Sequence, residues 1–222
     1  MSRIILTALA ALLLLGGAGC DPLKPGRELM AQGKYEASAK FFLDRTKAHP
    51  DDYLAFNELG FAYSRLGMPG PAATAYQQAI KLKPDFFAAY LNLGTLSMKN
   101  NEIDAAYYAL RKAVELNPES EAAQANLAWT EASNFHNDDA ERHLQEAVRL
   151  SGDKNKYQVL AAAIAGSRAQ WQQIQQSKKR AKPGGTAVGP QAGGTAPAPK
   201  PGAGPVPAMT PAEPGSNPKS PN

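Results

Sequence analysis

Apolar and small residues recur every 34 residues in the middle of the chain, beginning at Tyr53. Three copies of the pattern follow one another in register over residues 53–86, 87–120 and 121–154, and a weaker copy lies within 20–52. Each copy has the pattern of two antiparallel helices, and one such pair alone cannot bury its apolar stripe. The pattern therefore predicts an all-α chain in which helix pairs stack on one another.

Glycines and prolines mark the crossings and the ends of these helices. Gly60 and Gly94 stand where the first helix of a pair should cross the second, and their small size lets the two backbones approach closely. A bulky side chain at such a crossing would overpack it by about 1–3 kcal/mol. Pro84 and Pro118 should end the second helices, because proline removes a hydrogen-bond donor and clashes with the preceding turn.

The stretch after the third copy, residues 155–182, predicts one further helix on an Ala- and Gln-rich background. We expect this helix to cap the end of the array, with its glutamines on a solvated outer face. Its apolar residues are Tyr157, Leu160, Ile164 and Trp171.

The repeat resembles the tetratricopeptide (TPR) repeat, which also has a period of 34 residues. The resemblance implies an α-solenoid of about three full repeats, with a partial first repeat and a C-terminal capping helix. The positions that carry it in the first full copy are Phe56, Leu59, Gly60, Tyr63, Ala72, Tyr76, Ala79 and Pro84.

The N-terminus has the pattern of a secretory signal. Arg3 precedes a 12-residue stretch, 4–15, which is apolar apart from Thr7 and too short to span a bilayer. The Gly17–Cys20 stretch then resembles the lipobox of bacterial lipoproteins, which implies a signal peptide over 1–19 and a diacylglycerol and acyl chain on Cys20. The alternative is an ordinary signal peptide, which would leave Cys20 as a free thiol.

The lipobox resemblance also implies a location. We expect the chain to be lipid-anchored to the bacterial cell envelope and to face the periplasm, on the outer membrane. Asp21 leaves the inner membrane as the alternative, since an Asp after the lipidated Cys resembles a retention signal there.

Composition separates the tail from the body. Residues 183–222 hold 11 of the 18 prolines and 8 of the 19 glycines, so we expect this segment to be disordered. Residues 21–177 carry 17 basic and 19 acidic residues, and no basic stripe that would indicate nucleic-acid binding.

Candidate chemistry is sparse. A single Cys and three His argue against a disulfide framework and a metal centre. His136 and His143 lack the spacing of a zinc motif, and no nucleophile or phosphate-binding motif is present. We therefore expect no catalytic residue, no metal, no small-molecule substrate and no cofactor apart from the lipid on Cys20.

A concave groove lined by the first helix of each repeat is the site that the TPR resemblance implies. We expect Phe61, Leu91, Met98 and Trp129 to be apolar residues that packing does not require, although some of them could instead fold under a neighbouring repeat or the capping helix. The groove residues are Leu54, Asn57, Phe61, Arg65, Leu91, Asn92, Thr95, Met98, Lys99, Asn126 and Trp129.

Polar residues of the groove suggest two further roles. Asn92 and Asn126 share one repeat position and resemble the start of a ladder that grips a peptide backbone, although Glu58 interrupts it. Arg65 and Lys99 share another position, where they could recognise a carboxylate or form a solvated rim.

A lipobox before a short TPR array resembles bacterial TPR lipoproteins, in particular the pilotin type that serves type IV and tight-adherence (Flp) pili. This resemblance implies a scaffold that binds a partner polypeptide, such as a secretin or another envelope-complex subunit, during pilus or secretin biogenesis. A scaffold that recruits peptidoglycan hydrolases or synthases, and an accessory subunit of an outer-membrane assembly or motility complex, remain alternatives.

Overall fold

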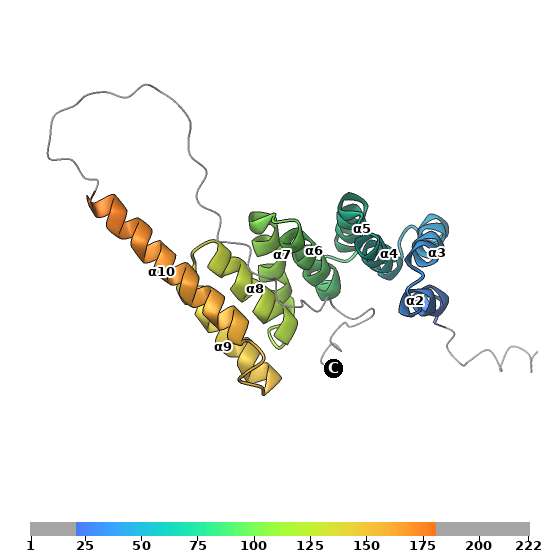
Figure 1. Cartoon of the computed structure of the whole chain (residues 1–222). Coiled ribbons are helices and arrows are strands. Elements are labelled where there is room, and N and C mark those ends of the chain that lie inside the picture. Colours follow the sequence, from blue (N-terminus) through green and yellow to red (C-terminus); the bar gives the residue numbers. More distant parts are fainter. Residues whose placement is uncertain (1–20, 181–222) are drawn as a thin grey trace, which may run out of the picture.

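A computed structural model describes residues 21–180 of the chain (Figure 1). Within this range every regular element is an α-helix, which confirms the all-α prediction there. The helices are α2 (Lys24–Ala31), α3 (Tyr35–Ala48), α4 (Tyr53–Arg65), α5 (Pro69–Leu82), α6 (Phe87–Lys99), α7 (Ile103–Leu116), α8 (Glu121–Ser133), α9 (Asn137–Ser151) and α10 (Gln158–Arg180).

Four turns with the same backbone geometry join the helices into pairs. Gly33, Gly67, Asn101 and Phe135 have φ values of 74, 70, 59 and 60° and stand 34 residues apart. Each residue closes the turn between the two helices of a pair. Gly adopts this left-handed conformation most readily, and Asn is the next most favourable residue. The repeat therefore extends back to the first pair, α2 and α3, whose opening helix has only 8 residues.

Glycines at the helix crossings make the close approach that the sequence predicts. A Cβ on Gly60 would lie 2.7 Å from the ring of Tyr76, and one on Gly94 would lie 2.6 Å from Cγ of Leu110. Gly26 occupies the equivalent place in the first pair, where a Cβ would lie 2.5 Å from the ring of Phe42. Because these partner rings and side chains are buried, only glycine fits.

Apolar clusters run from each helix pair into the next, and half-buried residues such as Leu54 and Trp129 contact two clusters each. The largest cluster joins α5, α6, α7 and α8 through Phe86, Leu110 and Leu127, among others. In Figure 1 the pairs follow one another along the molecule in chain order. The shared core makes each pair depend on its neighbours, as expected for a solenoid.

The last helix, α10, lies along α8 and α9 and covers the end of the array (Figure 1). Leu160 and Ile164 are buried against α8 and α9, and the Ser167 hydroxyl donates to the carbonyl of Ala132 at 2.6 Å. Most of the other face is exposed, including Gln172, Gln173 and Gln176, whereas Gln175 is half-buried. These contacts confirm the predicted capping role.

Candidate functional site

The first helices of the pairs, α4, α6 and α8, carry the predicted groove residues, and the structure divides them into three groups. Leu91 and Met98 belong to the buried core, with 1% and 2% of their surfaces exposed. The prediction that packing does not require these two residues is therefore wrong, because they fill the space between neighbouring pairs.

Buried polar residues form the second group. The Asn92 amide donates to Oδ1 of Asn57 at 3.1 Å, and the Asn126 amide donates to Oγ1 of Thr95 at 3.0 Å. All four side chains are almost fully buried, with exposures from 1% to 4%. The polar series at these positions thus links neighbouring first helices to one another, which differs from the predicted grip on a peptide backbone.

Glu58, which interrupts the asparagine series, is fully buried and pairs with a cation from the first helix pair. Nε of Arg27 lies 2.8 Å from its carboxylate, and the same guanidinium contacts Asp21 at 2.8 Å. Burial raises the pKa of Glu58, and the charge of Arg27 opposes this increase. The Asp21–Arg27–Glu58 chain therefore joins α2 to α4.

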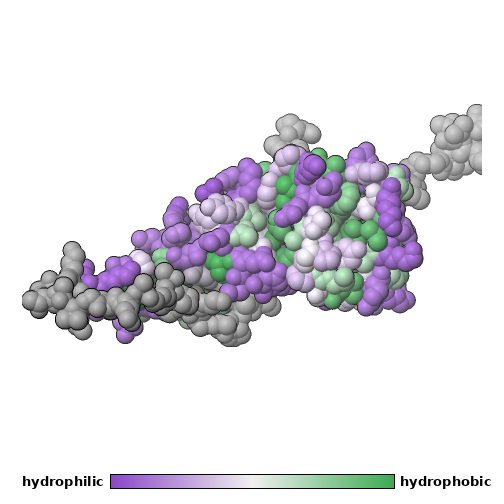
Figure 2. All heavy atoms as spheres, turned by 90° about the horizontal axis from the view of Figure 1, so that it is seen from above, coloured by the Kyte–Doolittle hydropathy of each residue, from purple (hydrophilic) through white to green (hydrophobic). Residues whose placement is uncertain are grey.

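Side chains that remain at least partly accessible form the third group. Leu54, Phe61 and Trp129 are half-buried, and Arg65 and Lys99 are exposed. Leu54 and Trp129 each pack against two core clusters, so they contribute both to the core and to the surface. Figure 2 shows that apolar side chains reach the surface in patches between hydrophilic ones.

The two cations of this group differ in their surroundings. Arg65 donates to the hydroxyl of Tyr35 at 2.7 Å and lies over the same ring, 4.9 Å from its centroid. This contact holds Arg65 against the first helix pair. Lys99 is exposed at the end of α6 and has no ion-pair partner among residues 21–180, so it is the better placed of the two to meet an anionic group.

A buried polar cluster between α8 and α9 was not foreseen from the sequence. Gln124 donates to the carbonyl of Pro118 at 2.7 Å, and its Oε1 lies 2.7 Å from Nδ1 of His143. The other ring nitrogen of His143 lies 3.6 Å from the carboxyl group of Glu131. Since the Gln124 amide already donates elsewhere, its Oε1 is the acceptor, and Nδ1 of His143 carries a hydrogen.

The repeat register contains the signal that would have revealed this cluster. Each of its three members stands where the first two full repeats have an apolar, aromatic or small residue. The counterparts are Phe56 and Tyr90 for Gln124, Tyr63 and Ser97 for Glu131, and Ala75 and Ala109 for His143.

Residues 21–180 contain neither a cluster of metal ligands nor a helix suited to a membrane. Among the described residues, no three His, Cys, Asp or Glu side chains come together as metal ligands. Between residues 21 and 180, none of the helices has the length and apolar character needed to cross a bilayer. The proposed lipid attachment site, Cys20, lies outside the described residues.

Two family models of the repeat match the middle of the chain. A TPR repeat model matches residues 71–100, and a tetratricopeptide repeat model matches residues 87–120. No curated protein matches the sequence significantly.

Several solved structures share the fold at low sequence identity. A crystal structure of MamA is 22% identical, with a TM-score of 0.57 over 71% of this chain and 96% of that chain. A mutant O-GlcNAc transferase of Thermobaculum terrenum is 22% identical, with a TM-score of 0.53 over 58% of this chain and 25% of that one. The Cut9–Hcn1 hetero-tetramer of APC/C contributes a chain that is 21% identical, with a TM-score of 0.56 over 66% of this chain and 29% of that one.

These matches agree with the helix pairs, the turns and the glycine crossings described above. Residues 21–180 thus form an all-α solenoid of the TPR type that ends in a capping helix.

Proposed function

We propose that this protein is a membrane-anchored scaffold that binds a partner polypeptide along the first-helix face of its TPR array. The partner is a subunit of a cell-envelope machine, and we assign the machine to pilus or secretin biogenesis. The scaffold itself is not an enzyme. The lipid on Cys20 fixes it to the envelope, facing the periplasm from the outer membrane.

The observation that carries this proposal is the presence of half-buried apolar side chains on two of the first helices. Leu54, Phe61 and Trp129 stand on α4 and α8 and keep part of their surfaces accessible. Partly exposed aromatic side chains with a polar rim are typical of protein-binding surfaces. The buried groove residues fix the distance between neighbouring first helices, and this spacing keeps the side chains of the surface in place.

The polar rim suggests what the partner offers. Lys99 ends the first helix of its repeat and is exposed. An extended or helical segment with apolar anchors and a carboxylate near one end would place its apolar residues on Phe61 and Trp129 and its charge near Lys99.

The lipid anchor contributes to binding through concentration. A scaffold confined to the membrane surface meets a membrane-bound client at a raised effective concentration, so a modest intrinsic affinity suffices.

Site-specific photocrosslinking in living cells tests the proposal. A benzoylphenylalanine at Lys99 should capture a defined envelope protein, because this exposed position borders the proposed surface. Tyr108 provides the matched control, since it is an aromatic residue on the second helix of the same repeat and is 66% exposed. A crosslinker there should not capture the same protein.

The identity of the captured protein then separates the machines. A secretin or pilus subunit supports the proposed assignment, whereas a peptidoglycan enzyme or a motility subunit would redirect it. Capture of the same set from both positions, or of no protein from Lys99, would contradict binding on the first-helix face.

A further inference from the structure

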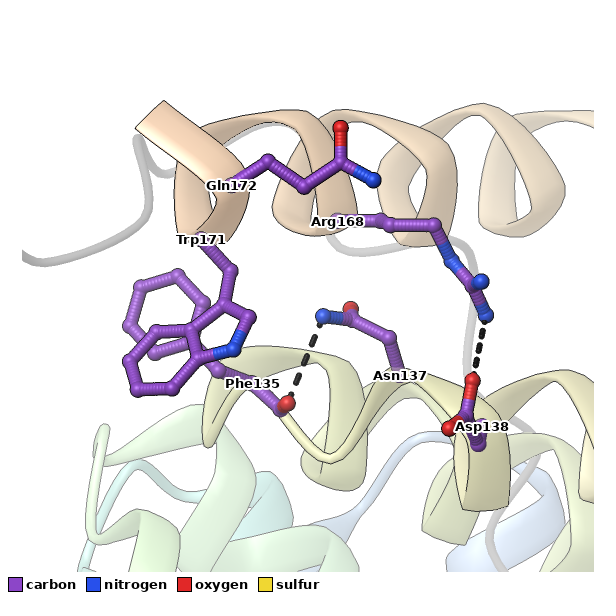
Figure 3. A pocket seen from close by; sticks show the side chains of 6 residues that line it. All are labelled: Phe135, Asn137, Asp138, Arg168, Trp171 and Gln172. Carbon is purple, nitrogen blue, oxygen red and sulfur yellow. Dashed lines mark hydrogen bonds and ion pairs between the residues drawn. The ribbon is translucent and has the colours of Figure 1, made fainter. Parts of the chain in front are cut away.

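A small pocket lies between the α8–α9 turn and α10 (Figure 3). It has a volume of about 220 Å³. Figure 3 shows the Phe135 and Trp171 rings at one end, the Arg168–Asp138 ion pair at the other, and Asn137 between them. The residues that line it are Phe135, Asn137, Asp138, Arg168, Trp171 and Gln172.

Two polar atoms at this pocket have no hydrogen-bond partner among the described residues. Asn137 is only 7% exposed, and its amide nitrogen donates to the carbonyl of Phe135 at 3.3 Å. This bond orients the amide and leaves its Oδ1 as a buried acceptor without a donor. Nε of Arg168 is likewise a buried donor without an acceptor. A ligand that carries one donor and one acceptor would satisfy both atoms.

The aromatic end of the pocket requires an unfavourable backbone conformation at Phe135. Phe135 has a φ of 60°, at the turn position where the other pairs have Gly or Asn. A bulky side chain in this left-handed conformation is an outlier. Its ring stacks on Trp171, with centroids 5.4 Å apart and planes at 26°, and Trp171 remains 38% exposed. The stacked pair thus presents an accessible aromatic wall beside the unpaired polar atoms.

A peptide backbone next to a proline ring fits this combination. A backbone N–H would donate to Oδ1 of Asn137, a backbone carbonyl would accept from Nε of Arg168, and the proline ring would lie on the indole. Proline-rich segments dock on aromatic-lined grooves because their extended conformation is already formed. A water molecule could meet either polar atom, but it would make no contact with the indole. Nζ of Lys178 lies over this indole, 5.9 Å from the ring centroid, and a proline ring on the indole would displace this lysine. We infer that this pocket binds an extended proline-containing segment, supplied by residues 183–222 of the same chain.

The sequence beyond α10 offers that segment at the right distance. About nine residues of α10, or about 14 Å, separate Trp171 from the helix end. An extended chain covers this distance in about five residues, so residues beyond about 190 can reach the pocket. Alternating alanines and prolines at 196–199 would provide backbone N–H groups and rings in turn.

Crosslinking in the purified full-length protein tests this inference. A benzoylphenylalanine at Gln172 should capture residues 183–222, and a mixture of ¹⁵N-labelled and unlabelled chains should show that both crosslinked peptides come from one molecule. Trp171→Ala should lower the yield at least fivefold. Replacement of residues 195–208 by a Gly/Ser segment of equal length should lower it similarly, and it leaves the pocket intact. Val159→Ala, on the same helix and 60% exposed, is the matched control and should not change the yield.

Three outcomes would overturn the inference. The first is a yield that neither change lowers, which would show that the tail is captured only because it is tethered nearby. The second is capture of residues 183–222 from a second molecule, and the third is no capture at all. None of them bears on the first-helix face, because that test uses position 99 and an envelope partner.

Discussion

Glu131 carries an ionisable carboxyl group into the interface between α8 and α9, where only 4% of the residue is exposed. Burial, with a smaller effect of the Asp139 carboxylate, raises the pKa of Glu131 to about 8, and Arg142 opposes the increase. His143 lies beside it, and burial lowers the pKa of this imidazole. Both groups are therefore mainly neutral at pH 7, where they form a polar but uncharged cluster.

This arrangement predicts a loss of stability at alkaline pH. In the unfolded chain the Glu131 carboxyl is fully ionised at pH 7, whereas the folded chain still holds the proton. Stability therefore falls as pH rises toward the folded pKa, by about 1 kcal/mol between pH 7 and 8.5. Urea unfolding at several pH values measures the fall. His143 adds only a small slope of opposite sign near pH 7, because its imidazole is neutral in the folded chain but still partly protonated in the unfolded chain.

Glu131→Gln should remove the pH dependence, since the amide cannot ionise, and should stabilise the protein at pH 8.5. Glu36→Gln, at an exposed position of α3, is the control and should keep the wild-type slope. An unchanged slope in Glu131→Gln would show that another group causes it.

At the scale of one helix pair, the glycine crossings determine how closely the helices approach. Gly60→Ala should destabilise the protein by about 1–3 kcal/mol, because the new Cβ would meet the buried Tyr76 ring at 2.7 Å and the Ala72 carbonyl at 3.1 Å. Gly70→Ala is the matched control, since a Cβ there meets nothing within 4 Å. It should be neutral or stabilising by up to about 1 kcal/mol, as thermal unfolding would show. A loss at Gly70 equal to that at Gly60 would refute the packing explanation.

The packing of the capping helix can be considered in the same way. This helix covers the side of the last helix pair on which a further pair would otherwise pack. Ile164 is 1% exposed and packs in the last core cluster. Ile164→Ala should cost about 2–5 kcal/mol in unfolding free energy, whereas Val159→Ala, on the exposed side of α10, should cost little. Denaturant unfolding compares the two, and equal losses would mean that α10 does not cap the core.

The helix pairs could be predicted because their packing repeats with the sequence. The same 34-residue period sets Gly60, Gly94 and the turn residues, so one copy predicts the next. The accessibility of the groove could not be predicted in the same way. It depends on how closely neighbouring first helices approach, and this spacing follows from the combined size of side chains such as Leu91 and Met98.

Departures from the repeat were harder to interpret. Phe135 stands where Gly and Asn stand in other pairs, and only the structure shows that Trp171, 36 residues later, is its stacking partner. Glu131 and His143 similarly become meaningful only when their helices are placed side by side. One residue that departs from the repeat pattern can have many explanations. Two such residues that contact each other indicate a specific structural feature.

At the scale of the whole molecule, the proposed anchor adjoins the folded array directly. Asp21 follows Cys20 in sequence, and its carboxylate accepts hydrogen bonds from the Leu23 backbone and from Arg27. No spacer therefore separates the lipid attachment site from α2. A lipidated Cys20 would hold the first helix pair against the bilayer, with α10 at the opposite end of the array (Figure 1).

Removal of the lipid should accordingly release the whole protein. Cys20→Ser cannot accept the diacylglycerol, and several acyl chains together contribute about 0.8 kcal/mol for each buried CH₂ group. We expect the wild type in the membrane pellet after carbonate washing and the variant in the soluble fraction. Asp21→Asn, which keeps the cysteine, should stay in the pellet. Crosslinking from Lys99 should weaken in Cys20→Ser, because the variant has lost its raised local concentration. A variant that still pellets, or that captures its partner as well as the wild type does, would show that the array works without a tether.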